Sequence, residues 1–246
     1  MLIPLILPAL LAATPPDPDT QKSIAEADRL EFAGDWEKAL ALYRKILPGN
    51  EGEVLWRMAG AYSDMSEAAA EDRKKALDAT AVELARWAVR AAPGSADAHS
   101  MLAVVLGRMA LFASAKEGVK ISREVKEEAE RAIAIDKGKF LPYLVLGIWN
   151  REITDLGFLE KAAAEVLFGG VPEASLEGSA RNLEKAVSLN PDSIKAHYEL
   201  AITCWEMGEK EKARKEMRQA ATRRPNRFLD RSIQAKAREK LEKFGG

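Results

Sequence analysis

The chain is poor in the residues that build reactive centres: its 246 residues include one cysteine, Cys204, and two histidines, His99 and His197. A single cysteine cannot form a disulfide within the chain, so no such bond stabilises the fold. Neither histidine has another histidine or a cysteine at metal-ligand spacing, and no nucleophile with a matching base is recognisable. The sequence therefore predicts a protein that is not an enzyme and that carries no metal ion and no cofactor.

Patterns typical of β-strands are also scarce. Residues branched at Cβ are sparse, no segment sustains an alternation of polar and apolar residues, and Ala, Glu, Lys, Leu and Arg dominate the chain. Because a strand needs either that alternation or a short apolar run rich in β-branched residues, the composition predicts an all-α fold.

No apolar run is long enough to cross a bilayer, which takes about twenty residues. The apolar segment Met1 to Ala13 is shorter, and the prolines of Thr14 to Asp19 exclude a helix there. No Lys or Arg precedes the apolar run, but its length suits a secretory signal and residues 11–13 offer a cleavage site. We expect residues 1–19 to be a signal peptide with a Pro-rich linker, and the protein to be exported to a bacterial periplasm or envelope. Alternatively, the segment stays uncleaved as a weak membrane anchor.

What the chain does contain is a repeat. Pro191 and Pro225 stand 34 residues apart, with Ala201 where two helices must touch and Gly208 where the first helix must close. Glycine is favoured at such a helix end because it adopts the left-handed conformation without strain. The remaining positions of the unit are His197, Leu200, Cys204, Ala213, Met217 and Ala220. This period and pattern are typical of a tetratricopeptide repeat.

Weaker copies of the unit begin near Ala27, Trp56, His99 and Tyr143. An amphipathic run from Leu156 to Phe168 predicts an inserted helix, and residues 229–244 predict a final capping helix. Residues 20–246 are therefore expected to form a single domain. We predict a tetratricopeptide-repeat solenoid of about five helical pairs with an inserted helix and a C-terminal capping helix.

His99 and His197 occupy the same position in their repeats, and Cys204 falls on the face toward the paired helix. Equivalent repeat positions are filled by packing needs. We expect a structural role for all three side chains.

Solenoids of this kind hold ligands on the inner wall. Trp205 follows the packed Cys204 by one residue, which rotates it toward that wall, and Trp149 stands at the matching edge of the preceding unit. Apolar area combined with cations for carboxylates suits peptide recognition. A core position is the alternative for both tryptophans. The residues that we expect to line the concave face are Trp149, Arg151, Lys195, Tyr198, Ile202 and Trp205.

Positive charge is concentrated at the C-terminal end. Residues 205–246 contain thirteen Lys and Arg against seven Asp and Glu, a net charge of +6 in a chain whose net charge is −1. A basic end could recruit an acidic peptide or an anionic lipid surface. The alternative is that these charges keep the outer face of a terminal helix in water. Nucleic acid is not expected as a partner of an exported chain.

Several inserts resemble one known family. They are the segments 53–59, 116–121 after His99, 146–149 and 167–175, and the resemblance runs from about Glu53 to Leu241. In that order they are similar to the regulator of microtubule dynamics family. The resemblance implies a helical-repeat adaptor, with eukaryotic members associated with microtubules and organelle membranes. We expect a bacterial relative that shares the shape but not the microtubule role.

The sequence thus predicts a non-catalytic adaptor that binds a peptide or protein on its concave face. The alternative is a carrier of a lipid or other apolar small molecule, with the inserted helix as a cover. The two differ in one property: a carrier needs an enclosed wall with few charges, whereas a peptide groove is open and ringed by Lys and Arg.

Overall fold

The computed structural model describes residues 16–156 and 173–245 of the chain. The apolar segment at residues 1–13 lies outside them. The predicted inserted helix also lies outside them, apart from its first residue, Leu156. The first helix begins at Pro18, so the expectation that residues 14–19 contain no helix is wrong for the last two of them, because proline is tolerated at the first position of a helix.

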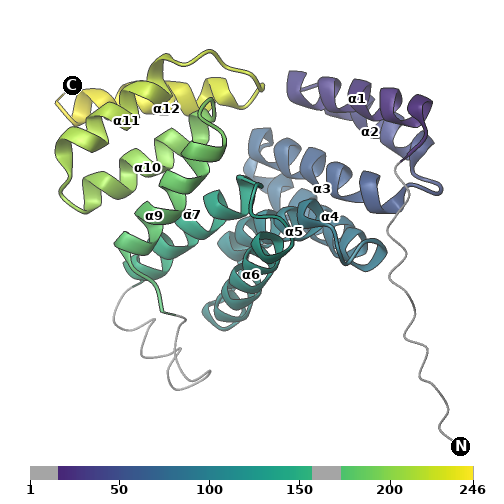
Figure 1. Ribbon diagram of the computed structural model, residues 1–246, viewed down its shortest axis with the longest axis horizontal. Coiled ribbons are helices and arrows are strands. Elements are labelled where there is room, and N and C mark those ends of the chain that lie inside the picture. The colour runs from purple at the N-terminus through teal and green to yellow at the C-terminus, as the bar shows by residue number, and fades with distance from the viewer. Residues whose placement is uncertain (1–15, 157–172, 246) are drawn as a thin grey trace, which may run out of the picture.

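The described residues form a series of antiparallel helical pairs (Figure 1). The pairs are α1 (Pro18–Ala33) with α2 (Trp36–Ile46), α3 (Glu51–Ala68) with α4 (Glu71–Ala91), α5 (Ala96–Met109) with α6 (Ala115–Ile135), α7 (Leu141–Asp155) with α9 (Leu176–Leu189), and α10 (Ile194–Glu206) with α11 (Lys210–Thr222). A short 3₁₀ turn, η1 (Ala110–Phe112), follows α5, and α12 (Asp230–Lys243) is the last helix. No strand occurs in this part of the chain. The all-α prediction and the five predicted pairs are confirmed.

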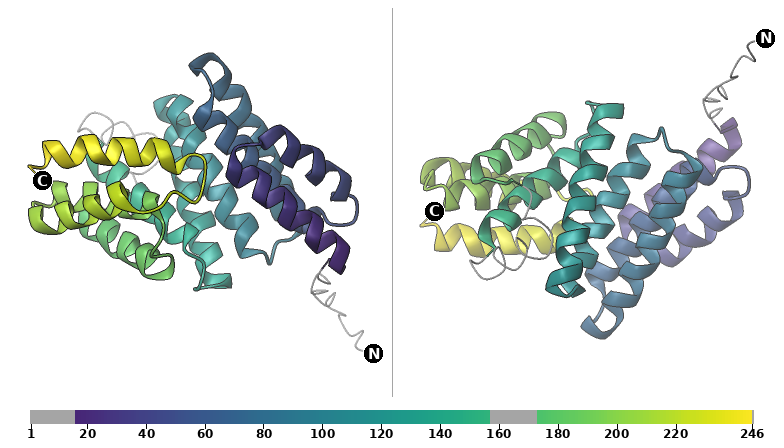
Figure 2. Two further views of the ribbon diagram at one scale, coloured as in Figure 1. Left: turned by 90° about the horizontal axis from the view of Figure 1, so that it is seen from above. Right: turned by 90° about the horizontal axis from the view of Figure 1, so that it is seen from below.

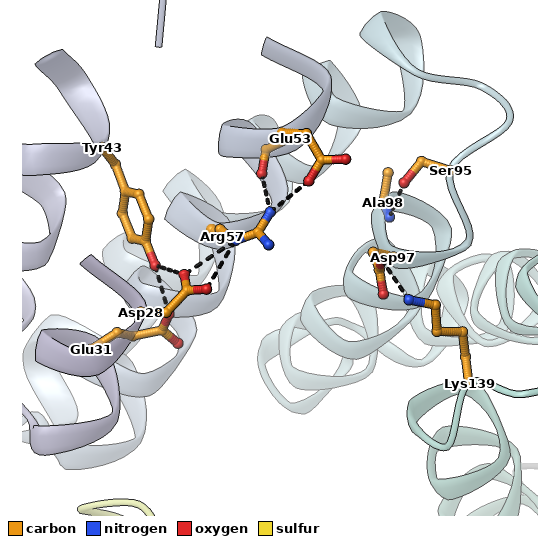
Figure 3. A network of polar contacts seen from close by, with 9 residues as sticks. All are labelled: Asp28, Glu31, Tyr43, Glu53, Arg57, Ser95, Asp97, Ala98 and Lys139. Atoms are coloured by element: carbon orange, nitrogen blue, oxygen red, sulfur yellow. Dashed lines mark hydrogen bonds and ion pairs between the residues drawn. The ribbon is translucent and has the colours of Figure 1, made fainter. Parts of the chain in front are cut away.

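Local sequence signals explain where the helices begin and end. Ser95, Ser175 and Ser193 precede α5, α9 and α10, and each hydroxyl accepts a backbone N–H three residues later at 3.0–3.2 Å. Figure 3 includes the cap at Ser95. Such caps satisfy donors that have no partner within the helix. Gly208 closes α10 with φ +81°, the left-handed conformation predicted for it.

Small side chains lie where the paired helices approach each other. Ala59, Ala103 and Ala201 are fully buried, and Gly147 takes the equivalent place on α7. Around them two large apolar clusters form, one mainly from α1 to α5 and one mainly from α9 to α12. The repeat positions predicted to face inward, such as Leu200 and Met217, are buried in the second cluster. The close approach of backbones therefore sets the spacing of these four pairs.

The two histidines make the same pair of contacts in their repeats. Nδ1 of His99 lies 2.5 Å from Oε2 of Glu128, and Nε2 lies 3.0 Å from the Pro93 carbonyl oxygen. In His197 the same atoms contact Glu216 at 2.6 Å and Pro191 at 2.8 Å. Each ring thus joins the second helix of its pair to the loop before the first helix. These contacts confirm the structural role predicted for both.

The stack of pairs curves until its two ends meet. In Figure 1 the path runs from purple α1 through the teal centre to yellow α12, and the loop before α12 returns toward α1. The left view of Figure 2 shows the same approach. The backbone N–H of Phe228 in this loop donates to the carbonyl oxygen of Phe32 at the end of α1, with a distance of 2.7 Å. The first and last parts of the described chain are therefore in direct contact.

We predict opposite effects of two glycine-to-alanine substitutions. A Cβ on Gly147 would lie 2.4 Å from Cγ of the buried Leu183, whereas a Cβ on Gly107 of α5 would meet nothing within 4 Å. Gly107→Ala should stabilise the protein by up to about 1 kcal/mol through helix propensity. Gly147→Ala should destabilise it by about 1–3 kcal/mol because the core must shift. Urea denaturation followed by circular dichroism measures both, and stabilisation by both variants would contradict the close contact of α7 with α9.

Candidate functional site

A cavity of about 370 Å³ lies between α7, α10 and α12, with one residue from the end of α3 in its wall. On α10 the lining positions recur every three or four residues, which places them on one face of the helix. The described residues that line it are Glu67, Arg151, Glu152, Lys195, Tyr198, Glu199, Ile202, Glu206, Ile233, Lys236 and Lys240. Four of the six residues expected on the concave face are among them: Arg151, Lys195, Tyr198 and Ile202.

The two tryptophans expected beside them lie elsewhere. Trp149 is 6% exposed, and its Nε1 donates to the carbonyl and the hydroxyl of Ser122 on α6, both at 2.9 Å. It stands at the repeat position of Thr203, which is also buried. The ring of Trp205 is stacked on Phe244 with 3.8 Å between centroids. Trp149 therefore belongs to the core, and Trp205 holds the end of α12 in place.

Two of the predicted cations are neutralised within the site. Nη2 of Arg151 lies 2.7 Å from Oε2 of Glu199, and Nζ of Lys195 lies 3.2 Å from Oε1 of the same carboxylate. Burial raises the pKa of Glu199, but the charges of Lys195 and Arg151 outweigh it and hold that pKa below its ordinary value. Glu199 is therefore ionised at neutral pH and joins Lys195 to Arg151, whose guanidinium also pairs with Glu152 at 3.1 Å.

Helix α12 contributes cations that are not committed in this way. The side chains of Lys236 and Lys240 line the cavity, and neither forms a hydrogen bond or ion pair with another described residue. Burial raises the pKa of Tyr198, so its hydroxyl is neutral and able to donate. The residues expected on the concave face did not include these two lysines, because that expectation considered only the first helices of the repeats and treated the basic end separately. The signal that could have found them was the basic excess of residues 205–246.

A second polar cluster holds the two ends of the chain together. We call residues 223–229, between α11 and α12, the strap. Nη2 of Arg227 in the strap lies 2.8 Å from Oδ2 of Asp64 on α3 and 3.2 Å from Oε1 of Glu31 on α1. The Tyr43 hydroxyl donates to the other oxygen of Glu31 at 3.1 Å and to Asp28 at 2.5 Å (Figure 3). Burial, together with the charge of Asp64, raises the pKa of Glu31 to about 7.

Other groups with chemical potential are in structural positions. Cys204 is buried, and burial raises the pKa of its thiol to about 11. The thiol is therefore protonated at neutral pH, as expected of a small core residue. Across the described residues, no three His, Cys, Asp or Glu side chains are grouped so as to hold a metal ion. The helices found in these same ranges are too short or too polar to span a membrane.

Helical pairs stacked in this way define the chain as a tetratricopeptide-repeat solenoid. A thermophilic TPR protein from Thermus thermophilus has a TM-score of 0.63 at 17% identity, covering 89% of this chain and 99% of that one. Yeast Tom70 has a TM-score of 0.52 at 12% identity, covering 92% of this chain and 40% of that one. These similarities confirm the predicted fold.

The family model of regulator of microtubule dynamics protein 1-3 matches residues 23–245. The chain is 30% identical over 230 residues to regulator of microtubule dynamics protein 3 of Rattus norvegicus, covering 91% of this chain and 49% of that protein. It is 26% identical over 174 residues to regulator of microtubule dynamics protein 1 of Mus musculus, covering 70% of this chain and 57% of that protein. The chain belongs to this family, as its inserts predicted, and spans about half the length of the curated relatives it matches.

The expected export to a bacterial periplasm is wrong. The matched relatives are proteins of vertebrates, whose cells have no periplasm. The prediction depended on the apolar character of residues 1–13. A short apolar run satisfies the length requirement of an export signal without specifying export, so composition alone was an insufficient basis.

We predict that Glu31 makes the protein less stable as the pH rises. Its pKa is about 7 in the fold against an ordinary value of 4.5, so the folded state holds this proton more tightly than the unfolded state does. That stabilisation is complete below pH 4.5 and is lost as the pH rises through 7. The free energy of unfolding of the wild type should fall by about 1–3 kcal/mol between pH 5.5 and pH 8. In Glu31→Gln this fall should be absent.

Urea denaturation of wild type and variant across this pH range is the measurement. Glu26→Gln is the matched control on α1, because Glu26 is exposed and its pKa is lowered by a hydrogen bond from Arg29. It should leave the decrease unchanged. An unaltered pH dependence in Glu31→Gln would contradict the assignment.

Proposed function

We propose that this protein is a non-catalytic adaptor whose cavity between α7, α10 and α12 holds an extended segment of a protein partner that carries carboxylates. The observation that carries the proposal is the pair of ammonium groups of Lys236 and Lys240, which form no hydrogen bond or close ion pair with another described residue and share the cavity with the Tyr198 hydroxyl. Ammonium and hydroxyl donors form strong, charge-assisted hydrogen bonds to carboxylates. Ile202 and Ile233 add apolar area between the charged groups, which suits the alternating surface of a polypeptide.

The composition of the wall favours a polypeptide over a lipid. Eight of its eleven described residues are charged, four of them acidic and four basic, and the other three are Tyr198, Ile202 and Ile233. An apolar molecule in such a site would remove charged groups from water without replacing their hydrogen bonds. A peptide replaces them with its own carboxylates and amides. The lipid-carrier alternative gains no support from this cavity.

Microtubules are one partner to test. The matched relatives are named regulators of microtubule dynamics, and this chain belongs to their family. Exposed cations on α11 and α12, such as Lys215, Arg218 and Arg231, would add electrostatic attraction to any acidic surface that delivers a segment to the cavity. Co-sedimentation with microtubules would show whether tubulin is such a partner.

We expect Lys236→Glu/Lys240→Glu to weaken partner binding by at least about tenfold, because two charge-assisted hydrogen bonds become repulsions. A photo-crosslinking residue at Ile202 identifies the bound polypeptide in cells that express the protein. Calorimetry with the synthetic cross-linked segment then gives the affinity of each variant.

The matched control is Lys137→Glu/Lys185→Glu, which changes the net charge equally at exposed positions outside the cavity and away from α11 and α12. Its affinity should stay within about twofold of wild type, as expected for exposed charges that make no direct contact. Equal losses in both double variants would refute a role for the cavity, since only net charge would then matter.

A further inference from the structure

We propose that α1, α2 and α3 carry a second binding site, specific for an arginine–aromatic dipeptide, which Arg227 and Phe228 of the strap occupy as an internal ligand. A partner segment that presents the same dipeptide displaces the strap. We call the receiving residues the closure site: Glu31, Phe32, Gly34, Trp36 and Asp64. None of them lines the cavity, so the inference is independent of the proposed function.

Three kinds of contact select the dipeptide. The Arg227 guanidinium bonds to the carboxylates of Asp64 and Glu31, and its Cζ lies 4.7 Å from the centroid of the Phe32 ring. The Phe228 N–H donates to the Phe32 carbonyl, a backbone contact of the kind used in peptide recognition. The site therefore contacts three features of the dipeptide at once: the charge of the arginine, the main chain, and the aromatic ring of Phe228.

The aromatic part of the site depends on Gly34. The Phe228 ring meets the edge of Trp36, with 5.3 Å between centroids and 85° between planes. A Cβ on Gly34 would lie 2.8 Å from this ring, and Gly34 also has φ +90°, which other residues adopt with strain. The closure site thus provides a place for one ring beside one guanidinium.

The contact between the strap and the closure site leaves more apolar surface exposed than a core contact does. Phe228 is 43% exposed and Phe32 is 45% exposed, although both are large apolar side chains. Nε1 of Trp36 is buried and has no hydrogen-bond partner among the described residues. An occupant that covers the two phenylalanines and supplies an acceptor would gain contacts that the strap does not make.

The dipeptide keeps its shape through contacts of its own segment. One carboxylate oxygen of Asp230 accepts the backbone N–H groups of Asn226 and Arg227, both at 2.9 Å. These bonds span at most four residues, so a short segment of another chain with this pattern would adopt the same turn. Preorganisation of this kind lowers the entropy lost on binding.

Because the closure site is acidic, the strap is more easily replaced by another cationic segment than released into solvent. If Arg227 left alone, Glu31 and Asp64 would both lose the cation whose charge offsets the cost of their burial, and Glu31 is only 6% exposed. Removing one member of a buried ion pair is strongly destabilising because the other charge stays unpaired. The site therefore favours a ligand that brings its own cation. Helix α12 begins directly after the strap, so exchange would also release the end of the helix that walls the cavity.

A synthetic peptide of residues 223–231 tests the inference against the full chain. It should bind Arg227→Ala/Phe228→Ala at least about tenfold more tightly than wild type, in which the tethered strap competes at an effective concentration near 1 mM. Alanine in place of the arginine and phenylalanine in the peptide should abolish binding, and so should Asp64→Asn added to the double variant. Circular dichroism confirms that each variant is folded.

Equal affinity for wild type and the folded double variant, or no binding to that variant at about 1 mM peptide, would overturn the proposal. If the double variant does not fold, hydrogen exchange in the wild-type chain decides. Excess peptide should then accelerate exchange of the Phe228 amide, which the bond to Phe32 protects, and the alanine-substituted peptide should not. Unchanged exchange with both peptides would also overturn it.

Discussion

Close contact between paired helices through small side chains is the constraint on which the whole structure depends. Ala59, Ala103, Gly147 and Ala201 occupy equivalent places, and each lets two backbones approach. Because the spacing repeats, successive pairs turn through a regular path and their first helices share one inner wall. Bulk at Gly147 would push α7 away from Leu183 of α9, and α7 carries residues that line the cavity.

The meeting of the two chain ends is a second constraint, and it is electrostatic. In a solenoid each unit packs on its neighbours, so the first and last units have no inherent reason to touch. Here Arg227 reaches Glu31, 196 residues away in sequence. Burial of Glu31 beside Asp64 is unfavourable on its own, as the raised pKa of Glu31 indicates, and the guanidinium partly offsets that cost. The ends therefore stabilise each other by complementary charge, together with the backbone hydrogen bond of Phe228 to Phe32 and the contact of the Phe228 ring with Trp36.

Together these constraints decide the chemistry of the cavity. The helical stack places Arg151 beside Lys195, but both are held by Glu199. Helix α12 packs on α11 and α10 as the last helix of the stack, which places Lys236 and Lys240 in the wall. The uncommitted positive charge of the wall thus comes from the last helix and not from the repeats. A ligand in this cavity would contact both the solenoid and the segment that closes it.

Much of the fold could be predicted from sequence because its signals are local. The period of 34 residues, the left-handed Gly208 and the buried small positions all follow from contacts within one helical pair. The capping helix was predicted as residues 229–244 and is observed as Asp230–Lys243. Four of the six residues expected in the site do line the cavity. This signal is also local, because spacing along one helix determines which side chains share a face.

The sequence by itself thus determined the helical pairs, their family and the inward faces of α7 and α10. Tertiary structure alone decided what covers those faces. Helical spacing could not show that Trp149 packs on α6 or that Phe244 stacks on Trp205, because both partners come from other helices. Nor could a repeat pattern reveal the contact of Arg227 with Glu31 and Asp64. Periodicity encodes contacts between neighbours, whereas this contact exists only because the complete stack curves far enough for its ends to meet.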